Sequence, residues 1–287
     1  MSVGLLPSTS CYYLKYFMFT TIINDCRDDN ACGRQESRLA SLLDTSLSFI
    51  GVESDLEASM QLVDVLDATE GRQGLVLVNV APRGGHTTKW ENGTPFGYFY
   101  YGQTLVLASV DGYTLSAVKH LGLMTELVLL DTHTSAEAML TAGFISELAA
   151  KQIPTTQFRS FDFLPRAGAF ILKGNALPTT PHDLSLIPEL PKAIWHIDNF
   201  GNCKTTLTTE DVRLDDITST RFGELPYFEQ LRNVPDGAHA LVHGSSGIND
   251  TRFIELMAQC SNFARIHNAK IGDGVFIEES YFRKATN

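Results

Sequence analysis

Apolar and polar positions along the first two-thirds of the chain predict strands and helices that follow one another in alternation. Two continuous apolar runs, residues 18–25 (MFTTIIND) and 74–82 (GLVLVNVAP), are typical of buried strands, because each ends in polar or turn-forming residues. Residues 96–115 predict a hairpin, since two aromatic or β-branched runs flank Gly102. A short strand is expected at 47–52, and helical spacing of apolar residues is found at 37–47, 55–66 and 137–151. This order predicts an α/β domain over residues 18–174 with a mainly parallel sheet.

The pattern changes after residue 174. Residues 175–192 hold four prolines and no helical period, which predicts a linker. Short strands are expected at 193–200, 202–209, 239–246 and 274–280, with one helix-like segment at 251–266. This pattern predicts a smaller, mainly antiparallel β-barrel-like domain over residues 193–287. Residues 1–17 are expected to be an extra N-terminal segment outside the fold, because the strand-like phrase begins at Met18.

The net charge and the distribution of charged residues limit which classes of molecule the chain is expected to bind. The chain of 287 residues carries 22 Lys and Arg against 33 Asp and Glu, a formal net charge of −11. Nucleic-acid binding needs clustered cations that neutralise phosphates, and no such cluster is present in the sequence. No apolar run approaches the roughly 20 residues of a membrane span. We therefore expect a small-molecule substrate and neither a nucleic acid nor a membrane partner.

The cysteines give no sign of a metal site. Their number is odd, and no pair has the spacing of zinc ligands. We therefore expect reduced thiols, a cytoplasmic protein, no metal and no cofactor. The five are Cys11, Cys26, Cys32, Cys203 and Cys260.

A first candidate site follows the first predicted strand. Ligands of open α/β sheets bind at the carboxyl ends of the strands, so the Asp25 carboxylate is placed to accept hydrogen bonds from sugar hydroxyls. An acidic turn, in which Asp28 or Asp29 caps the next helix, explains the same residues.

The loop after the strand at 74–82 is a second candidate. Two adjacent glycines let the backbone approach a ligand, and exposed N–H groups there can hold an anion. His86 lies between Arg83 and Lys89 in this loop. The spacing is not that of a Walker loop, and a polar hairpin connection with a solvated histidine is an equally good explanation.

Two further phrases lie in the second predicted domain. Asp198, Phe200 and Asn202 surround one glycine between two short strands, where Asp and Asn can bind a polar head group and Phe can stack. A hairpin turn explains these residues equally. Ser245 and Ser246 end a strand before the helix-like segment, so their hydroxyls and the helix N–H groups predict a carboxylate site, or simply a helix cap. Neither a GxSxG nor an HExxH motif is present.

The sequence motifs described above occur in the same order, and with similar spacing, as the motifs of one protein family. In chain order, this sequence has TIIND (21–25) with Asn30 where the family has TDFGxxD, APRGGHTTK (81–89) where it has DPGVGTxRR, and VDG (110–112) where it has PDNG. It then has FRSFDFLPRAGA (158–169) for the family motif FHGRDIFxPAGA and HIDNFGNCKTT (196–206) for YIDxFGNxxTN. LPYFE (225–229) and SSG (245–247) correspond to the family motifs LPYxE and SSG. A further phrase continues from 254–259 to 272–273. The chain thus resembles the S-adenosylmethionine hydroxide adenosyltransferase family, relatives of fluorinase and chlorinase, over about residues 18–280.

The resemblance implies an N-terminal α/β domain, a C-terminal β-barrel-like domain, and a homotrimer with ligand sites between subunits. It implies that Asp25, with Asn30 nearby, binds the ribose hydroxyls. It also implies that Ser160 occupies the position where halogenating relatives place a halide-contacting serine. The methionine or adenine part would be held by Asp198, Phe200, Asn202, Ser245 and Ser246.

The chain departs from the family where the reaction takes place. Hydroxide-using members set an Asp, an Arg and a His around the attacking water, and the matching positions here hold Ala81, Lys89 (or Thr88) and Arg159. Ala81 cannot act as a general base. Arg159, Ser160 and His86 are the remaining candidates for holding an anion or orienting water.

Three functions are consistent with the sequence. The first is hydrolysis of S-adenosylmethionine by attack of water or hydroxide at C5′, which gives adenosine and methionine; a halide in place of water is a variant of it. The second is a catalytically degenerate homologue that binds an adenosyl ligand. The third is an unrelated α/β enzyme. We take the hydrolase as the working hypothesis, because it is the commonest chemistry of the family that the chain resembles. The missing Asp, Arg and His do not exclude it, since a neutral thioether needs no protonation to leave and positioning of the nucleophile can suffice.

Overall fold

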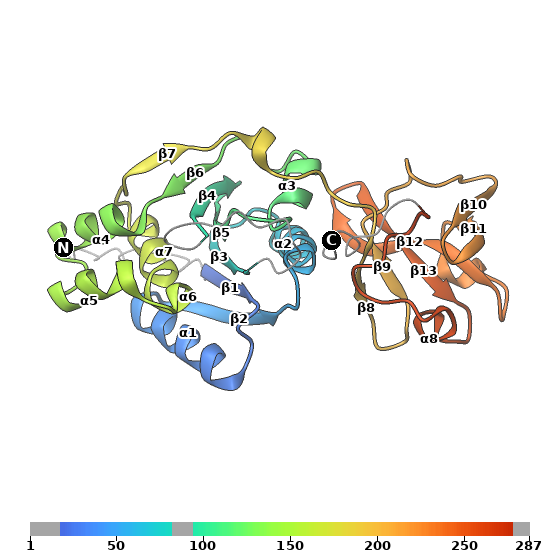
Figure 1. Ribbon diagram of the computed structural model, residues 1–287, viewed down its shortest axis with the longest axis horizontal. Helices are drawn as coiled ribbons and strands as arrows, with labels where there is room; N and C mark the ends of the chain where they lie inside the picture. Colours follow the sequence, from blue (N-terminus) through green and yellow to red (C-terminus); the bar gives the residue numbers. More distant parts are fainter. Residues whose placement is uncertain (1–17, 82–93, 278–287) are drawn as a thin grey trace, which may run out of the picture.

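The computed structural model describes residues 18–81 and 94–277, and these residues form two sheets with flanking helices (Figure 1). The first sheet has seven strands in the order β2-β1-β3-β5-β4-β6-β7. They are β1 (Met18–Asn24), β2 (Thr45–Gly51), β3 (Gly74–Asn79), β4 (Phe96–Tyr101), β5 (Thr104–Ser109), β6 (Val128–Leu130) and β7 (Thr179–Pro181).

The first sheet is parallel on one side and antiparallel on the other. Strands β2, β1, β3 and β5 pair in parallel, whereas β4, β6 and β7 continue the sheet through antiparallel pairs. The predicted hairpin is present as β4 and β5, and its two-residue turn uses Gly102 with φ +57°. Strand β7 lies within residues 175–192, so that stretch contributes an edge strand.

Helices cover both faces of the first sheet. Ile22 and Leu77 belong to the apolar cluster under α1 and α7, while the adjacent Ile23 and Val78 belong to the cluster under α2 and α3. Neighbouring strand residues point to opposite faces, so a strand buried on both sides must be apolar throughout. The helices are α1 (Asp29–Leu42), α2 (Asp55–Thr69), α3 (Ser116–His120), α4 (Thr132–Thr141), α5 (Glu147–Gln152), α6 (Arg159–Asp162) and α7 (Leu164–Leu172).

The second sheet has six strands in the order β10-β11-β12-β13-β9-β8. All of its pairs are antiparallel except a short parallel contact between β11 and β12. The coarse prediction of a largely parallel first sheet and an antiparallel second sheet is confirmed, but the sheet is open, because its outer strands β8 and β10 do not pair with each other. The expectation of a β-barrel-like domain is therefore wrong. The elements are β8 (Ile194–Ile197), β9 (Cys203–Thr205), β10 (Ile217–Thr220), β11 (Gly223–Phe228), β12 (His239–Ile248), β13 (Thr251–Ala258) and α8 (Phe263–His267).

The helix expected at 251–266 is largely a strand. Residues Thr251–Ala258 form β13 in the middle of the second sheet, and only Phe263–His267 are helical. Phe253 packs with the cluster around α2, whereas Ile254 and Leu256 pack in the core of the second sheet. A strand buried on both faces gives a nearly continuous apolar run, which periodicity cannot distinguish from a buried helix. The strand expected at 274–280 is reduced to one bridge, between Gly274 and Ala193, among its described residues.

Two helices of the first domain also differ from prediction. Helix α1 begins at Asp29, eight residues before the expected start, because the Asp28 carboxylate accepts hydrogen bonds from the backbone of Asn30 and Ala31. The single helix expected at 137–151 is divided into α4 and α5, and Gly143 between them has φ +67°. A glycine in this conformation ends a helix.

Polar contacts join the two sheets where α2 packs against β12 and β8. The Asp64 carboxylate accepts from the Ser246 hydroxyl at 2.9 Å and from the Gly247 N–H at 3.0 Å. Arg252 donates through both terminal nitrogens to Asp67, at 2.8 and 3.2 Å. We call these residues the inter-sheet contact. Figure 1 shows α2 facing the second sheet.

Candidate functional site

The parallel strands β1, β3 and β5 end at one edge of the first sheet, which we call the carboxyl edge. Asn24, the last residue of β1, is buried and donates from its Nδ2 to Gln35 Oε1 of α1 at 2.6 Å. Its Oδ1 accepts from Asn79 Nδ2 at 3.2 Å, at the end of β3. Ser109 ends β5 and both donates to and accepts from the backbone of Val80, at 3.1 and 3.2 Å. Side-chain hydrogen bonds thus fix the ends of these strands.

Asp25 belongs to this edge. Its backbone N–H donates to Asn79 O at 3.2 Å, and its Oδ2 accepts from the Ala81 N–H at 3.1 Å. The carboxylate is therefore oriented by the segment that follows β3. Ligands of open α/β sheets bind at this edge.

Arg159 reaches the same edge from α6, and Ser160 is the next residue of that helix. The guanidinium carbon of Arg159 lies 4.9 Å from the centre of the Phe96 ring, and Phe96 is paired with Ser109 across β4 and β5. Burial lowers the pKa of Arg159, and within residues 18–81 and 94–277 no ion pair or hydrogen bond neutralises its guanidinium. Ser160 is only 3% exposed. The edge therefore combines a fixed carboxylate with a half-buried cation.

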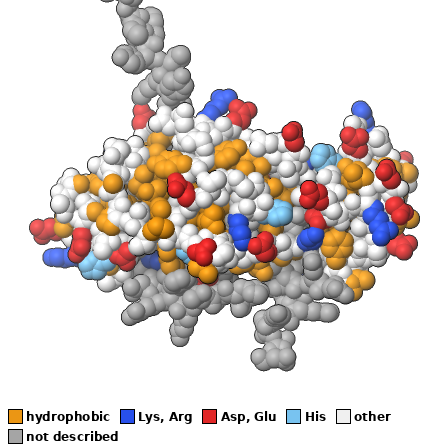
Figure 2. Space-filling model, turned by 90° about the horizontal axis from the view of Figure 1, so that it is seen from above, with side chains coloured by type: hydrophobic (Ala, Val, Ile, Leu, Met, Phe, Trp, Pro, Cys, Tyr) orange, Lys and Arg blue, Asp and Glu red, His pale blue; other side chains and the backbone are white. Residues whose placement is uncertain are grey.

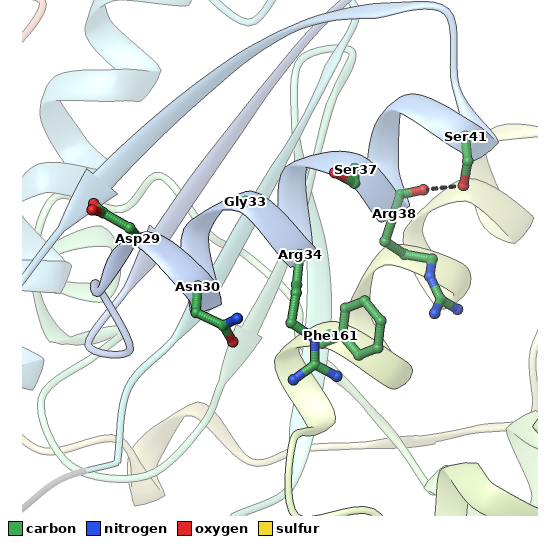
Figure 3. Close-up of a pocket in the computed structure, with 8 residues that line it drawn as sticks. All are labelled: Asp29, Asn30, Gly33, Arg34, Ser37, Arg38, Ser41 and Phe161. Carbon is green, nitrogen blue, oxygen red and sulfur yellow. Dashed lines mark hydrogen bonds between the residues drawn. The ribbon is translucent and has the colours of Figure 1, made fainter.

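Asn30 lies in the first turn of α1 and not on a loop. It lines a shallow cavity of about 540 Å³ between α1 and α6, to which Arg34, Arg38 and Phe161 also contribute (Figure 3). The alternative interpretation of the acidic segment is confirmed in part, because Asp28 is the N-cap of α1.

Asp198, Phe200 and Asn202 form one turn between β8 and β9. Asp198 Oδ1 accepts from the N–H groups of Phe200 and Asn202, both at 2.9 Å, and Oδ2 accepts from Asn202 Nδ2 at 3.0 Å. Gly201 has φ +87° and packs closely against Asn262, so a side chain cannot be accommodated there. The Phe200 ring is 69% exposed. The turn exposes the Phe200 ring to solvent, and both carboxylate oxygens of Asp198 accept hydrogen bonds from groups within the turn.

Ser245 and Ser246 lie inside β12 and precede β13, so a strand follows them where a helix N-terminus was expected, and they do not cap a helix. Their hydroxyls accept hydrogen bonds from Lys204 Nζ at 3.1 and 2.8 Å. Ser246 also donates to Asp64, whose pKa is raised by burial despite these hydrogen bonds. Both serines are therefore already engaged by charged groups of the chain.

The structure distributes the candidate residues over four places. Asp25 and Arg159 belong to the carboxyl edge of the first sheet, with Ser160 buried next to Arg159 in α6, and Asn30 lines the cavity between α1 and α6. The Asp198 turn belongs to the second sheet, and Ser246 belongs to the inter-sheet contact. His86 lies outside the described residues.

The sequence interpretation did not select several residues that complete these places. Asn24, Asn79 and Gln35 build the carboxyl edge; the signal for the two asparagines is that a polar residue ends each strand, and Gln35 of α1 has no such signal. Arg34 was missed because the helix was expected to begin only at residue 37, so its place on one helix face with Arg38 was not predicted.

Several properties of the described residues bear on the class of protein. In residues 18–81 and 94–277 no group of three His, Cys, Asp or Glu side chains could hold a metal ion. Across the same part of the chain, no helix has both the length and the apolar character needed to span a bilayer. On the face seen in Figure 2, the described acidic and basic side chains are interspersed, and Lys and Arg do not form a continuous row.

Comparison with known proteins defines the class by fold. The chain aligns with an uncharacterized conserved protein from Thermotoga maritima at a TM-score of 0.60 and 15% identity, over 88% of this chain and 97% of that one. It also aligns with a conserved hypothetical protein from Thermus thermophilus at a TM-score of 0.54 and 16% identity, over 89% and 97% of the two chains. No protein-family model and no curated protein matches the sequence. The chain therefore shares a two-sheet α/β fold with these proteins, and at such identities the likeness concerns the fold alone.

Proposed function

We propose that the carboxyl edge of the first sheet binds S-adenosylmethionine and that the protein hydrolyses it to adenosine and methionine. The observation that carries the proposal is the presence at one edge of the sheet of an oriented carboxylate, Asp25 after β1, and a cation, Arg159 over Phe96 of β4, that has no anionic partner among the described residues. An enzyme of this kind needs an acceptor for the ribose hydroxyls and a group that orients an anionic or polarised nucleophile. The motif order described above agrees with this assignment.

The reaction at this edge is a displacement at C5′ of the adenosyl group. The water or hydroxide oxygen forms a bond to C5′ while the C5′–sulfur bond breaks, and the electron pair leaves with sulfur as neutral methionine thioether. A proton from the attacking water passes to solvent. Because the leaving group needs no protonation, alignment and desolvation of the nucleophile are the main requirements. Arg159 and the buried Ser160 are the groups that would orient it.

The remaining candidate residues suit a site shared between subunits. Asp198, Phe200 and Asn202 lie in the second sheet, and the exposed Phe200 ring offers a stacking face for adenine. In a homotrimer, the turn of one subunit would complete the carboxyl edge of the next, and Ser245 and Ser246 would lie nearby. The ligand would then be held by two copies of the chain.

One observation favours a second candidate function, a binding protein without turnover. Ala81 contributes only its backbone N–H to the carboxyl edge, so no side chain at this position can remove a proton from water. A protein with the Asp25 acceptor but no base would retain the ligand without converting it.

The test is incubation of the full chain with S-adenosylmethionine, with and without chloride, followed by chromatography of the nucleoside products. Adenosine supports the hydrolase, and a 5′-chloro-nucleoside indicates a halide nucleophile. Binding of S-adenosylmethionine in a calorimeter without product selects the binding protein. Absence of both binding and product contradicts the assignment of the site.

A further inference from the structure

The cavity between α1 and α6 contains an aromatic ring flanked by two arginines. The guanidinium carbons of Arg34 and Arg38 each lie 4.3 Å from the centre of the Phe161 ring, and Arg34 also lies 4.9 Å from the Phe158 ring. Figure 3 shows the Phe161 ring between the two arginine side chains. Phe158 and Phe161 are themselves stacked, with ring centres 5.5 Å apart. The two cations are therefore held by a fixed aromatic pair.

The arrangement follows from the spacing of residues on α1. Arg34, Ser37, Arg38 and Ser41 are three or four residues apart, so they share one helix face, and all four line the cavity. An adjacent stripe of the helix is buried and contains Ala31, Gln35 and Leu39. Gly33, beside Arg34, has no atom within 4 Å of the place where a Cβ would lie. The helix thus presents basic and hydroxyl groups to an open space.

Neither guanidinium is neutralised by the protein. Within the described ranges no hydrogen bond or ion pair involves the side chain of Arg34 or Arg38, whereas Arg27, Arg72, Arg213, Arg221 and Arg252 each contact a carboxylate. Asp29 also lines the cavity, but in Figure 3 its carboxylate points away from the two guanidiniums. In a chain of net charge −11, two neighbouring cations without a carboxylate form a local site of opposite sign.

We propose that this cavity binds the phosphate groups of a small phosphorylated molecule. A guanidinium presents a planar fork that matches two phosphate oxygens, and stacking on Phe161 orders both forks before a ligand arrives. Ser37 adds a hydroxyl donor beside them, whereas the Ser41 hydroxyl already donates to Arg38 O at 2.7 Å (Figure 3). Two cations match a group that carries two or more negative charges better than a single carboxylate. The site shares no residue with the Asp25 and Arg159 edge, so it goes beyond the function proposed above.

The test is a calorimetric titration of the full chain with inorganic diphosphate at low ionic strength. We expect Arg34→Gln and Arg38→Gln each to weaken binding about tenfold or more, since each removes charge-assisted hydrogen bonds to the ligand. The matched control is Arg232→Gln, which removes the same charge from an exposed arginine in another part of the chain. It should leave the affinity unchanged.

Two further measurements separate a built site from general charge attraction. Arg38→Lys keeps the charge but loses the planar fork, so we expect it to bind diphosphate several-fold more weakly than the wild type, with an unchanged melting temperature. Citrate, which offers carboxylates instead of phosphates, should bind more weakly than diphosphate. The proposal is overturned if diphosphate does not bind, if Arg232→Gln weakens binding as much as Arg34→Gln, or if citrate binds equally well. Binding of S-adenosylmethionine, measured on the same variants, reports separately on the other site.

Discussion

The carboxyl edge of the first sheet and the inter-sheet contact each contain a prominent arginine, in opposite electrostatic situations. Arg252 at the inter-sheet contact donates to both oxygens of Asp67, and this hydrogen bonding raises its pKa. Arg159 at the edge lies over the Phe96 ring, and burial lowers its pKa, with no carboxylate beside it in the described part of the chain. The protein pairs the first cation with a carboxylate, whereas the second has no anionic partner among the described residues.

This difference distinguishes charges that stabilise the fold from charges that are suited to bind a ligand. A charge paired within the chain contributes to stability, and its loss leaves a partner without compensation. A half-buried charge without a partner costs stability, and it is retained where a ligand supplies the opposite charge. The four substitutions below test this distinction, from the largest expected effect to the smallest.

Removal of the Asp25 carboxylate should have the largest effect. In Asp25→Ala we expect adenosine formation to fall about 100-fold, because two charge-assisted hydrogen bonds to ribose, each about 1.5 kcal/mol or more, are lost. Product chromatography measures the rate. Asp25→Asn is the control, since its amide oxygen still accepts from the Ala81 N–H, and it should fold normally while losing most of the activity. Full activity of the Ala variant would remove Asp25 from the site.

Substitution of Arg252 should change stability and not activity. Arg252→Gln loses the two bonds to Asp67 and one to Gly247 O, and we expect the unfolding free energy to fall by about 1–2 kcal/mol. Denaturant unfolding measures it. Arg213→Gln is the matched control, because Arg213 pairs with Asp216 at 3.4 Å on an exposed surface and should contribute almost nothing. A reduced rate of adenosine formation in folded Arg252→Gln would contradict the distinction between Arg252 as a structural charge and Arg159 as a functional one.

Substitution of Arg159 should have effects of opposite sign on activity and stability. Arg159→Met retains an apolar stem over Phe96 but removes the buried charge. We expect kcat/KM for S-adenosylmethionine to fall about tenfold, while the unfolding free energy stays constant or rises by up to about 1 kcal/mol. Steady-state kinetics and denaturant unfolding on one preparation give both values. A loss of stability with unchanged kinetics would make Arg159 a structural residue.

The smallest effect concerns the pH dependence at Asp64. Burial raises the pKa of Asp64, so the folded state binds its proton more tightly than the unfolded state does. The stability contributed by this group is therefore fully present below its ordinary pKa and is lost as the pH rises through the folded value. Relative to Asp64→Asn, we expect the unfolding free energy of the wild type to fall by up to about 1 kcal/mol as the pH rises from acid to neutral, measured by denaturant unfolding. If the difference in unfolding free energy between the two proteins does not vary with pH, the raised pKa of Asp64 is contradicted.

The sequence predicts the first sheet better than the second for a physical reason. β1, β3 and the β4–β5 hairpin are buried apolar runs with clear ends, whereas β13 is buried on both faces and resembles a helix in its periodicity. The apolar pattern places the start of α1 too late because Gln35 occupies a buried position and interrupts that pattern. Burial in the folded sheet decides the case of β13, and the local N-cap Asp28, which an apolar pattern does not register, decides the start of α1.

The candidate sites, like the fold, could be predicted only in part from the sequence. Asp25 and the Asp198 turn follow from strand ends and turn-forming residues, which are local signals. The position of Arg159 over Phe96 depends on the placement of α6 against the sheet. The link between Ser246 and Asp64 joins residues 182 positions apart. Such contacts depend on the folded topology.

Hydrolysis in water enriched in ¹⁸O tests the central claim most directly. If water attacks C5′ at the carboxyl edge, mass spectrometry will find the label in the 5′-hydroxyl of adenosine and none in methionine. Absence of adenosine, or label in the amino-acid product, would contradict the proposed reaction.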